Sequence, residues 1–302
     1  LVDYQRAIDL GTDHQETYLA VARLQVLQGN REGAFVTLDE GASRHPDWVE
    51  VRIQSLPILV DRRDAIGARR VLGEVRSLIP TFGDVPPMSP KAAPLDESAA
   101  DFICRMVNAH PGEITLCPVG PFTNITLALR RDPGIAKKVK NVTVMGGSLE
   151  EGGNVTPHAE ANIWQDPHAA REVFAADWPV TMVGLDVTHQ VVCTPEHFSS
   201  LTEPAPKLGG FLNEAAQFYF AFHRKENGIR GCHMHDPTAV ISIVRPDLFG
   251  YRDCVLDVVV NGEKTGATVA AIGQSVPPAK VCMDIEIDAV RNLFLDTIKT
   301  GF

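Results

Sequence analysis

Short apolar runs alternate with helical stretches in the middle of the chain, and this alternation restricts the possible fold more than any other feature. The runs are Ile114 to Val119, Val142 to Met145 and Val180 to Val183. They have the length and composition of buried parallel strands. Helices are predicted between them over Asn124 to Arg131 and Pro167 to Ala176, the second with Asp166 as N-cap. The pattern predicts an α/β fold with a parallel sheet covered on both faces and ligand groups at the carboxyl ends of the strands.

The first 80 residues follow a different pattern, with a period of 34 residues. Three pairs of residues have this separation and lie at equivalent places in a helical pattern: Ala34 and Ala68, Leu38 and Leu72, Pro46 and Pro80. Helices are predicted over Glu16 to Leu27, Arg31 to Arg44, Trp48 to Val60, and Asp64 to Leu78. This all-α segment resembles about two and a half tetratricopeptide repeats. The resemblance implies a surface for a protein partner.

Composition places a boundary after the repeats. Residues 1–82 contain ten Arg and no Lys, whereas residues 83–302 contain nine of each. The proline-rich stretch from Gly83 to Pro90 then reads as a connector. We therefore expect two domains, a helical-repeat segment over 1–82 and an α/β domain over 83–302.

Charge and cysteine content limit the partners and the location. The chain has 28 Lys plus Arg, 38 Asp plus Glu and a formal net charge of -10. Binding to nucleic acid requires clustered Lys and Arg, so we expect no nucleic-acid partner. No apolar stretch approaches the roughly 20 residues of a membrane span, so no membrane is expected. The six cysteines form no CxxC pair and predict reduced thiols in a cytoplasmic protein.

Polar side chains gather in a glycine-rich loop after the second predicted strand. Asn154, Glu160 and Asn162 lie within nine residues there. Carboxylate and amide groups suit the recognition of several hydroxyl groups at once. The alternative is a capped loop in which these side chains bond to the backbone, and the residues alone favour that alternative.

Two further segments carry ionisable groups. His235 and Asp236 are adjacent, and such a pair facing a cleft can supply a general acid and a ligand for a hard metal ion. Adjacent side chains usually diverge, however, so the two need not share one task. Asp186 follows the third strand and either approaches the site or caps the turn; its spacing favours the cap.

Taken together, five segments resemble the inosine-uridine preferring nucleoside hydrolases. In chain order they are GEITLCPVGPFTN, VTVMGG, GNVTPHAEANIWQDPHAA, VTMVGLDVTHQ and HDPTAV. The resemblance covers Gly83 to about Phe302. It implies an α/β enzyme that cleaves the N-glycosidic bond of ribonucleosides with the help of a bound calcium ion. The expected architecture is thus a parallel-sheet, nucleoside hydrolase-like domain after the helical repeats.

The resemblance also implies a role for each matching residue. Asp236 and the main-chain carbonyl of Val119 correspond to calcium ligands, and His235 to the histidine that helps the base depart. Asn154, Glu160 and Asn162 correspond to contacts with the ribose hydroxyls. His223 and Tyr219 fall near the aromatic residues that contact the base.

The sequence departs from the family pattern in two places. Ala161 replaces the phenylalanine that is usual between Glu160 and Asn162. The family also opens with an aspartate cluster that supplies two calcium ligands and the base that activates water, and residues 1–82 do not reproduce it. The nearest candidate, Ile58 to Ala65, lacks the glycine and carries two arginines. Because calcium takes 6–8 oxygen ligands, we expect weak or absent calcium binding and little unaided turnover.

The missing strands leave a sheet edge that something must cover. There are three alternatives: the repeats cover this edge, a second chain covers it, or the chain is an unnatural join of two segments and the edge stays open. Two functions therefore compete. One is a nucleoside hydrolase, which we expect to be a homo-oligomer; the other is an impaired hydrolase-like scaffold or nucleoside sensor that binds a protein through its repeats.

Overall fold

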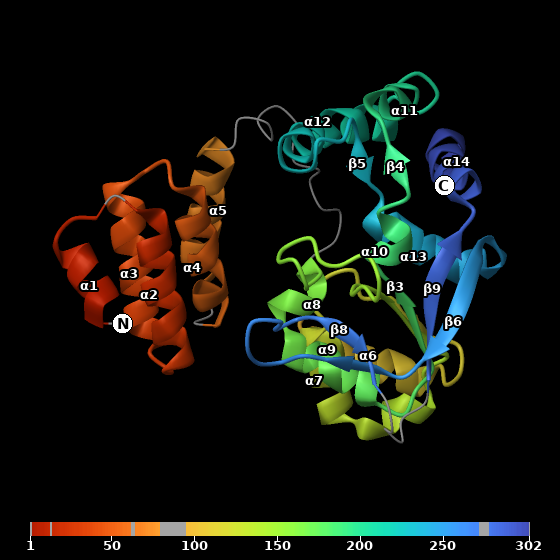
Figure 1. The fold of residues 1–302 in the computed structure, drawn as a ribbon, viewed down its shortest axis with the longest axis horizontal. Coiled ribbons are helices and arrows are strands. Elements are labelled where there is room, and N and C mark those ends of the chain that lie inside the picture. The colour runs from red at the N-terminus through yellow and green to blue at the C-terminus, as the bar shows by residue number, and fades with distance from the viewer. Residues whose placement is uncertain (1, 13, 62–63, 79–94, 272–277, 302) are drawn as a thin grey trace. The chain divides into compact units, whose positions relative to one another are not determined.

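The computed structural model describes residues 2–12, 14–61, 64–78, 95–271 and 278–301 (Figure 1). The chain divides into two compact units, residues 1–87 and 88–302. Each unit has hydrophobic core clusters made of its own residues. The domain boundary predicted between residues 82 and 83 falls outside the described residues.

The described part of the first unit is helical. Its helices are α1 (Val2–Asp9), α2 (Gln15–Leu27), α3 (Arg31–Arg44), α4 (Val49–Asp61) and α5 (Ala65–Leu78). Each packs against the next one along the chain. The four predicted helices therefore agree with α2 to α5 to within one residue at each end. Their assignment as tetratricopeptide repeats stays a prediction.

Local signals explain these helix boundaries. Gly29 follows α2 with φ +78°, a conformation that glycine adopts without strain. The side chain of Asn30 then accepts a hydrogen bond from the Gly33 amide at 2.9 Å and caps α3. Between the helices, Leu19, Leu38 and Val51 are buried in one apolar cluster.

The second unit contains a five-stranded sheet. In spatial order its strands are β1 (Thr115–Leu116), β2 (Asn141–Met145), β3 (Val180–Val183), β9 (Ala279–Ile285) and β6 (Phe249–Cys254). Neighbours from β1 to β9 run parallel, as predicted, but β6 is antiparallel to β9. Only two residues of the predicted first strand pair. Two small antiparallel sheets join β4 (Val192–Cys193) to β5 (Cys232–His233) and β7 (Leu256–Val258) to β8 (Thr268–Ala270).

Helices cover both faces of the sheet. On one face lie α6 (Ala99–Ala109), α7 (Thr123–Arg131) and α9 (Pro167–Ala175), and on the other α10 (Leu185–Thr188), α13 (His235–Val244) and α14 (Ile287–Thr300). The remaining helices are α8 (Ala161–Gln165), α11 (Pro195–Ser199), α12 (Leu208–Asn227) and the short 3₁₀ turns η2 (Pro133–Lys137) and η3 (Pro246–Leu248). Strand alternation divides the two cores, since Val142 and Val144 face α7 and α9 whereas Met145 belongs with α13.

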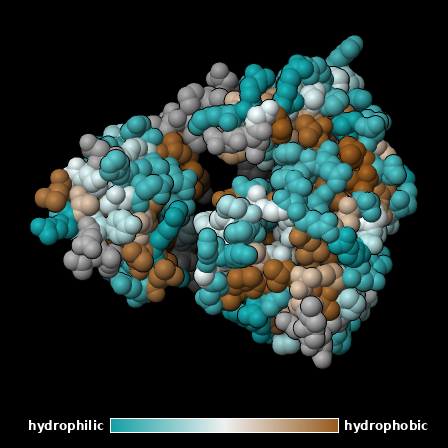
Figure 2. Space-filling model, in the orientation of Figure 1, coloured by the Kyte–Doolittle hydropathy of each residue, from teal (hydrophilic) through white to brown (hydrophobic). Residues whose placement is uncertain are grey.

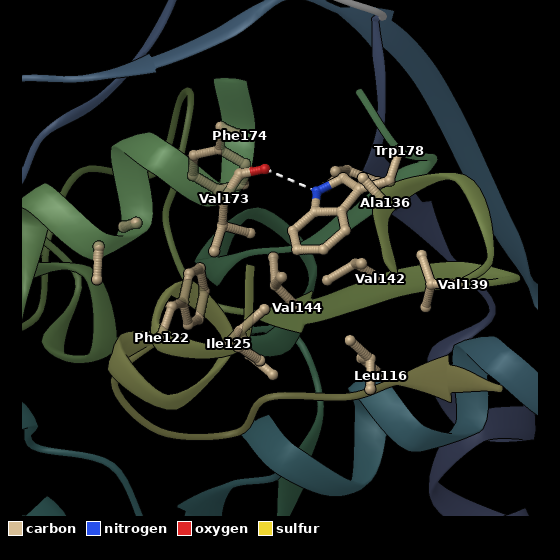
Figure 3. Packing of buried hydrophobic residues seen from close by; sticks show 14 of the residues in the cluster. Leu116, Phe122, Ile125, Ala136, Val139, Val142, Val144, Val173, Phe174 and Trp178 are labelled. Carbon is tan, nitrogen blue, oxygen red and sulfur yellow. Dashed lines mark hydrogen bonds between the residues drawn. The ribbon is translucent and has the colours of Figure 1, made fainter. Parts of the chain in front are cut away.

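Figure 3 shows the first of these cores. Phe122, Phe174 and Trp178 pack against β2, and the two phenylalanine rings meet edge to face at 6.1 Å between centroids. The Trp178 indole donates to the Val173 carbonyl at 2.8 Å, so its one polar atom is satisfied inside the core. This packing fixes the strands whose carboxyl ends carry the polar loops.

The surface is mixed in character, and the cysteines are unpaired. Figure 2 shows hydrophilic residues over much of the visible surface, with hydrophobic residues in separate groups. Among the described residues, no helix combines the length and apolar character needed to cross a bilayer. All six cysteines are free thiols, four of them buried.

Candidate functional site

A cavity of about 460 Å³ opens beside the carboxyl ends of β1, β2 and β3. The eight residues singled out from the sequence all line it: Val119, Asn154, Glu160, Asn162, Tyr219, His223, His235 and Asp236. They come from segments up to 117 positions apart in the sequence (236 − 119 = 117). The fold thus brings together every residue that the sequence suggested for this site.

The loop after β2 supplies the polar side of the cavity. Glu160 is the N-cap of α8, and its buried carboxylate accepts from the amides of Gly147 and Ile163, both at 3.1 Å. Burial raises the pKa of this carboxyl, against the effect of these hydrogen bonds. Asn154 accepts from the Ala161 amide at 2.9 Å, and Asn162 donates to the Met145 carbonyl at 3.1 Å. The capped-loop interpretation is therefore correct, and the same three side chains still line the cavity.

Asp186 does not line the cavity. Its buried carboxylate accepts from three consecutive amides, those of Leu149 at 2.9 Å, Glu150 at 2.7 Å and Glu151 at 3.1 Å. Asp186 therefore caps the loop after β2, and not the turn that follows its own strand. Asp186 ties the helix after β3 to the loop after β2, and so holds that loop in place.

His235 and Asp236 begin α13, directly after β5, and both reach the cavity. The His235 Nδ1 lies 2.8 Å from the Thr188 hydroxyl. Burial, with neighbouring histidines as a smaller cause, lowers the pKa of His235 to about 3, so the ring is neutral at pH 7. Partial loss of water around Asp236 raises the pKa of its carboxyl. Despite being adjacent in sequence, the two side chains therefore face one cavity.

Aromatic side chains of α12 form another wall. Tyr219 meets His223 edge to face with ring centroids 4.4 Å apart. Tyr219 is 40% exposed, whereas His223 is buried. Burial of the hydroxyl end is the main cause that raises the pKa of Tyr219. A flat ligand could thus pack against this wall.

The sequence reasoning missed several lining residues. They are Met145, Val155, His189, Phe222 and His233, whereas Ala161, which the sequence analysis named, also lines the cavity. His189 is bonded through Nδ1 to Glu151 at 3.2 Å, and its ring lies 4.5 Å from that of His233 between centroids. Burial lowers the pKa of His233 to about 4. The signal for His189 was its place directly after the third strand and its helix, in the motif that also contains Asp186.

The residues present do not fit a calcium ion by themselves. No group of three or more His, Cys, Asp or Glu side chains arranged for a metal occurs in the described ranges. Of the carboxylates lining the cavity, Glu160 is already bonded to backbone amides, which leaves Asp236. The segment Ile58 to Ala65 was the nearest candidate for the missing aspartate cluster. There Asp64 accepts from the Gly67 amide at 2.8 Å and caps α5, and the Asp61 side chain is not among those that the structure describes. Calcium needs 6–8 oxygen ligands, more than this set supplies.

Comparison with known proteins identifies the family of this chain. The model of the family "Inosine-uridine preferring nucleoside hydrolase" matches residues 36–292, a range that begins within α3. "Probable uridine nucleosidase 1" of Oryza sativa subsp. japonica is 39% identical over 181 residues, which are 60% of this chain and 56% of that protein. "Pyrimidine-specific ribonucleoside hydrolase RihB" of Escherichia coli is 35% identical over 228 residues, covering 75% of this chain and 71% of that protein.

Solved structures give the same result. A plant nucleoside hydrolase superposes with a TM-score of 0.69 at 32% identity, covering 72% of each chain. A "Purine-Preferring Ribonucleoside Hydrolase from Gardnerella vaginalis" gives 0.67 at 35% identity, covering 71% of this chain and 69% of that chain. The chain spans 56% of the length of the rice and Arabidopsis uridine nucleosidases that it matches. With a family match over most of the sequence and relatives above 30% identity, the chain belongs to the inosine-uridine preferring nucleoside hydrolase family.

Proposed function

We propose that the cavity binds a ribonucleoside and serves hydrolysis of its N-glycosidic bond, which gives ribose and a free base. The observation that supports this most is that all eight residues suggested by the sequence line one cavity. The relatives' names point the same way, since they are uridine nucleosidases and ribonucleoside hydrolases.

In this proposal the two sides of the cavity hold the two halves of the nucleoside. Asn154, Glu160 and Asn162 lie together and bind the ribose hydroxyls, with amide groups that donate and oxygens that accept. Tyr219 and His223 pack against the base. His235 faces the departing base with the ring nitrogen that Thr188 leaves open.

Activation of water is the step for which the described residues supply no group. The family resemblance assigns calcium to Asp236 and Val119, but one carboxylate and one carbonyl do not make a calcium site. We therefore expect the isolated chain to bind calcium more weakly than micromolar. General-base activation contributes about 10²–10⁴-fold. Turnover by this chain should therefore be lower by that factor than turnover by an enzyme that has such a base. Isothermal titration that shows micromolar calcium binding would contradict this expectation.

The direct test is incubation with inosine and with uridine, with and without calcium, followed by chromatography of the free base. The bacterial pyrimidine-specific relative serves as the reference. Slow release by wild type that disappears in His235→Ala and Asp236→Ala, but not in the exposed control His158→Gln, supports the proposal. If neither inosine nor uridine binds or is cleaved, the proposal is rejected.

A second candidate is a nucleoside sensor. Two carboxylates line the cavity, and within the described ranges only Asp236 makes no hydrogen bond. Because one such carboxylate does not make a calcium site, binding without hydrolysis is the second candidate. A sensor would bind uridine and release no uracil. Capture of a protein through the helices of residues 1–82 would add to that interpretation.

We also propose that the chain acts in the cytoplasm, as a homo-oligomer, with a protein partner on the helical unit. Free cysteines support a reducing compartment. Within the described sheet β1 pairs on one side alone, and its other edge supports contact with another chain. Exposed Leu10, Leu27 and Ile66 support a partner on the helices.

A further inference from the structure

Two histidines that line the cavity are each held by one ring nitrogen. His189 Nδ1 lies 3.2 Å from Glu151 Oε1, and His235 Nδ1 lies 2.8 Å from Thr188 Oγ1. The ring centroids are 5.5 Å apart, with the ring planes inclined by 57°. In both rings Nε2 is therefore the nitrogen left for a ligand, but the two partners differ in chemistry.

The partner of His189 is an acceptor. An ionised carboxylate cannot donate a hydrogen bond, so the Glu151 contact requires a proton on His189 Nδ1. In the neutral ring, Nε2 then carries a lone pair. The position of Glu151 is itself fixed, because its amide donates to Asp186 at 3.1 Å and to the Ser148 hydroxyl at 3.1 Å.

The partner of His235 is a donor. Thr188 is fully buried, and its hydroxyl makes no other hydrogen bond in the described part of the chain. A buried O–H group without an acceptor is costly, so this hydroxyl donates to His235 Nδ1. The neutral ring then carries its proton on Nε2.

We propose that Glu151 and Thr188 are positioning residues that hold His189 and His235 in opposite tautomers, so that the cavity presents a hydrogen-bond acceptor and a donor on neighbouring rings. A ligand group between them must offer hydrogen to His189 and an acceptor atom to His235. This last step rests on the proposed binding of ribonucleosides; the tautomers themselves do not.

The tautomers can be read by two-bond ¹H–¹⁵N correlation spectra of ¹⁵N-histidine-labelled protein at pH 8, because protonated and unprotonated ring nitrogens have well-separated shifts. His189→Gln and His235→Gln assign the signals. We expect the unprotonated nitrogen to be Nδ1 in His235 and Nε2 in His189. The reverse in either ring would overturn the proposal.

Matched variants test the two positioning residues. Thr188→Val removes the hydroxyl and should mix the His235 tautomers, whereas Thr188→Ser retains the donor and should restore the wild-type pattern. Glu151→Ala should mix those of His189, whereas Glu151→Gln retains an acceptor oxygen. If Thr188→Val does not fold, the wild-type spectrum still reports the tautomers of both histidines. The two Glu151 variants, at a half-exposed position, still test the partner of His189. Spectra unchanged in Glu151→Ala would contradict its role.

Uridine titration then separates this inference from the proposed function. Mixed His235 tautomers leave only part of the protein with the oriented donor, so Thr188→Val should weaken binding about twofold, whereas Thr188→Ser should stay near wild type. Absence of uridine binding by wild type, with the tautomers as expected, would reject the ribonucleoside site and retain the tautomer pair. Equal affinity in all four variants would reject the pair as a binding element.

Discussion

At the scale of single residues, Asp186 shows how a group outside the cavity sets the cavity's shape. Its carboxylate accepts from the amides of Leu149, Glu150 and Glu151. Asp186→Asn replaces one acceptor oxygen by an amide NH2 donor and should destabilise the fold by about 1–3 kcal/mol. It should also weaken uridine binding, because the loop that carries Glu151 loses its anchor. Urea denaturation and uridine titration measure the two effects.

The matched control for this change is Asp253→Asn. Asp253 is exposed on β6, and its side chain makes no hydrogen bond in the described ranges, so its substitution should change the free energy of unfolding by less than about 0.5 kcal/mol. An Asp186→Asn variant as stable as this control would show that the three hydrogen bonds contribute nothing.

His197 gives a pH-dependent prediction away from the cavity. Its Nδ1 accepts from the Thr194 amide at 3.0 Å in a capping box, which requires an unprotonated nitrogen. Burial lowers the pKa of His197 below its ordinary 6.5, with the Arg291 charge as a smaller cause. The unfolded chain then binds protons more readily than the folded one. The stabilisation is therefore complete above pH 6.5 and is lost as the pH falls towards the folded pKa.

His197→Gln keeps an acceptor that does not titrate. Relative to this variant, wild type should lose about 1 kcal/mol of unfolding free energy between pH 7.5 and pH 5. Parallel urea denaturation at several pH values measures the difference, and titrations common to both proteins cancel. His158→Gln, at an exposed position, should follow wild type at every pH. A constant difference between wild type and His197→Gln would disprove the linkage.

At the scale of elements, helix ends with local signals can be tested by their caps. Asp166 accepts from the Ala169 amide at 3.0 Å at the start of α9 and from the Thr123 hydroxyl at 2.6 Å at the start of α7. Asp166→Ala removes both bonds and should cost about 1–2 kcal/mol. Asp166→Ser keeps a capping oxygen and should recover at least half of that loss in thermal unfolding. Equal losses in both variants would show that the cap itself is unimportant.

The same helix shows what could be predicted from sequence and why. The start of α9 was predicted because Asp166 and Pro167 act within one turn. The antiparallel strand β6 was not, because its pairing with β9 joins segments about 30 residues apart and its register shifts between Gly250 and Tyr251. The cavity residues were found through family motifs, whereas Thr188 and Glu151 act through contacts that span 47 and 38 residues and appear only in the folded chain.

At the scale of the whole molecule, each hydrophobic cluster among the described residues is built from one unit alone. Leu38 is buried in the cluster of α2, α3 and α4, and Met182 in that of the sheet and its helices. Cooperative unfolding follows shared cores, so the two units should unfold in separate thermal transitions. Leu38→Ala should lower the stability of one unit by about 2–5 kcal/mol and leave the other transition in place.

Met182→Ala is the reciprocal variant and should move the other transition alone. Calorimetry resolves the two, and the ligand uridine provides the assignment, because a ligand raises the midpoint of the unit that binds it. Uridine should therefore shift the transition that Met182→Ala moves and not the one that Leu38→Ala moves. A single transition that both variants shift would show instead that the two units unfold together. That outcome is the one expected if the helices cover the unpaired edge of the sheet.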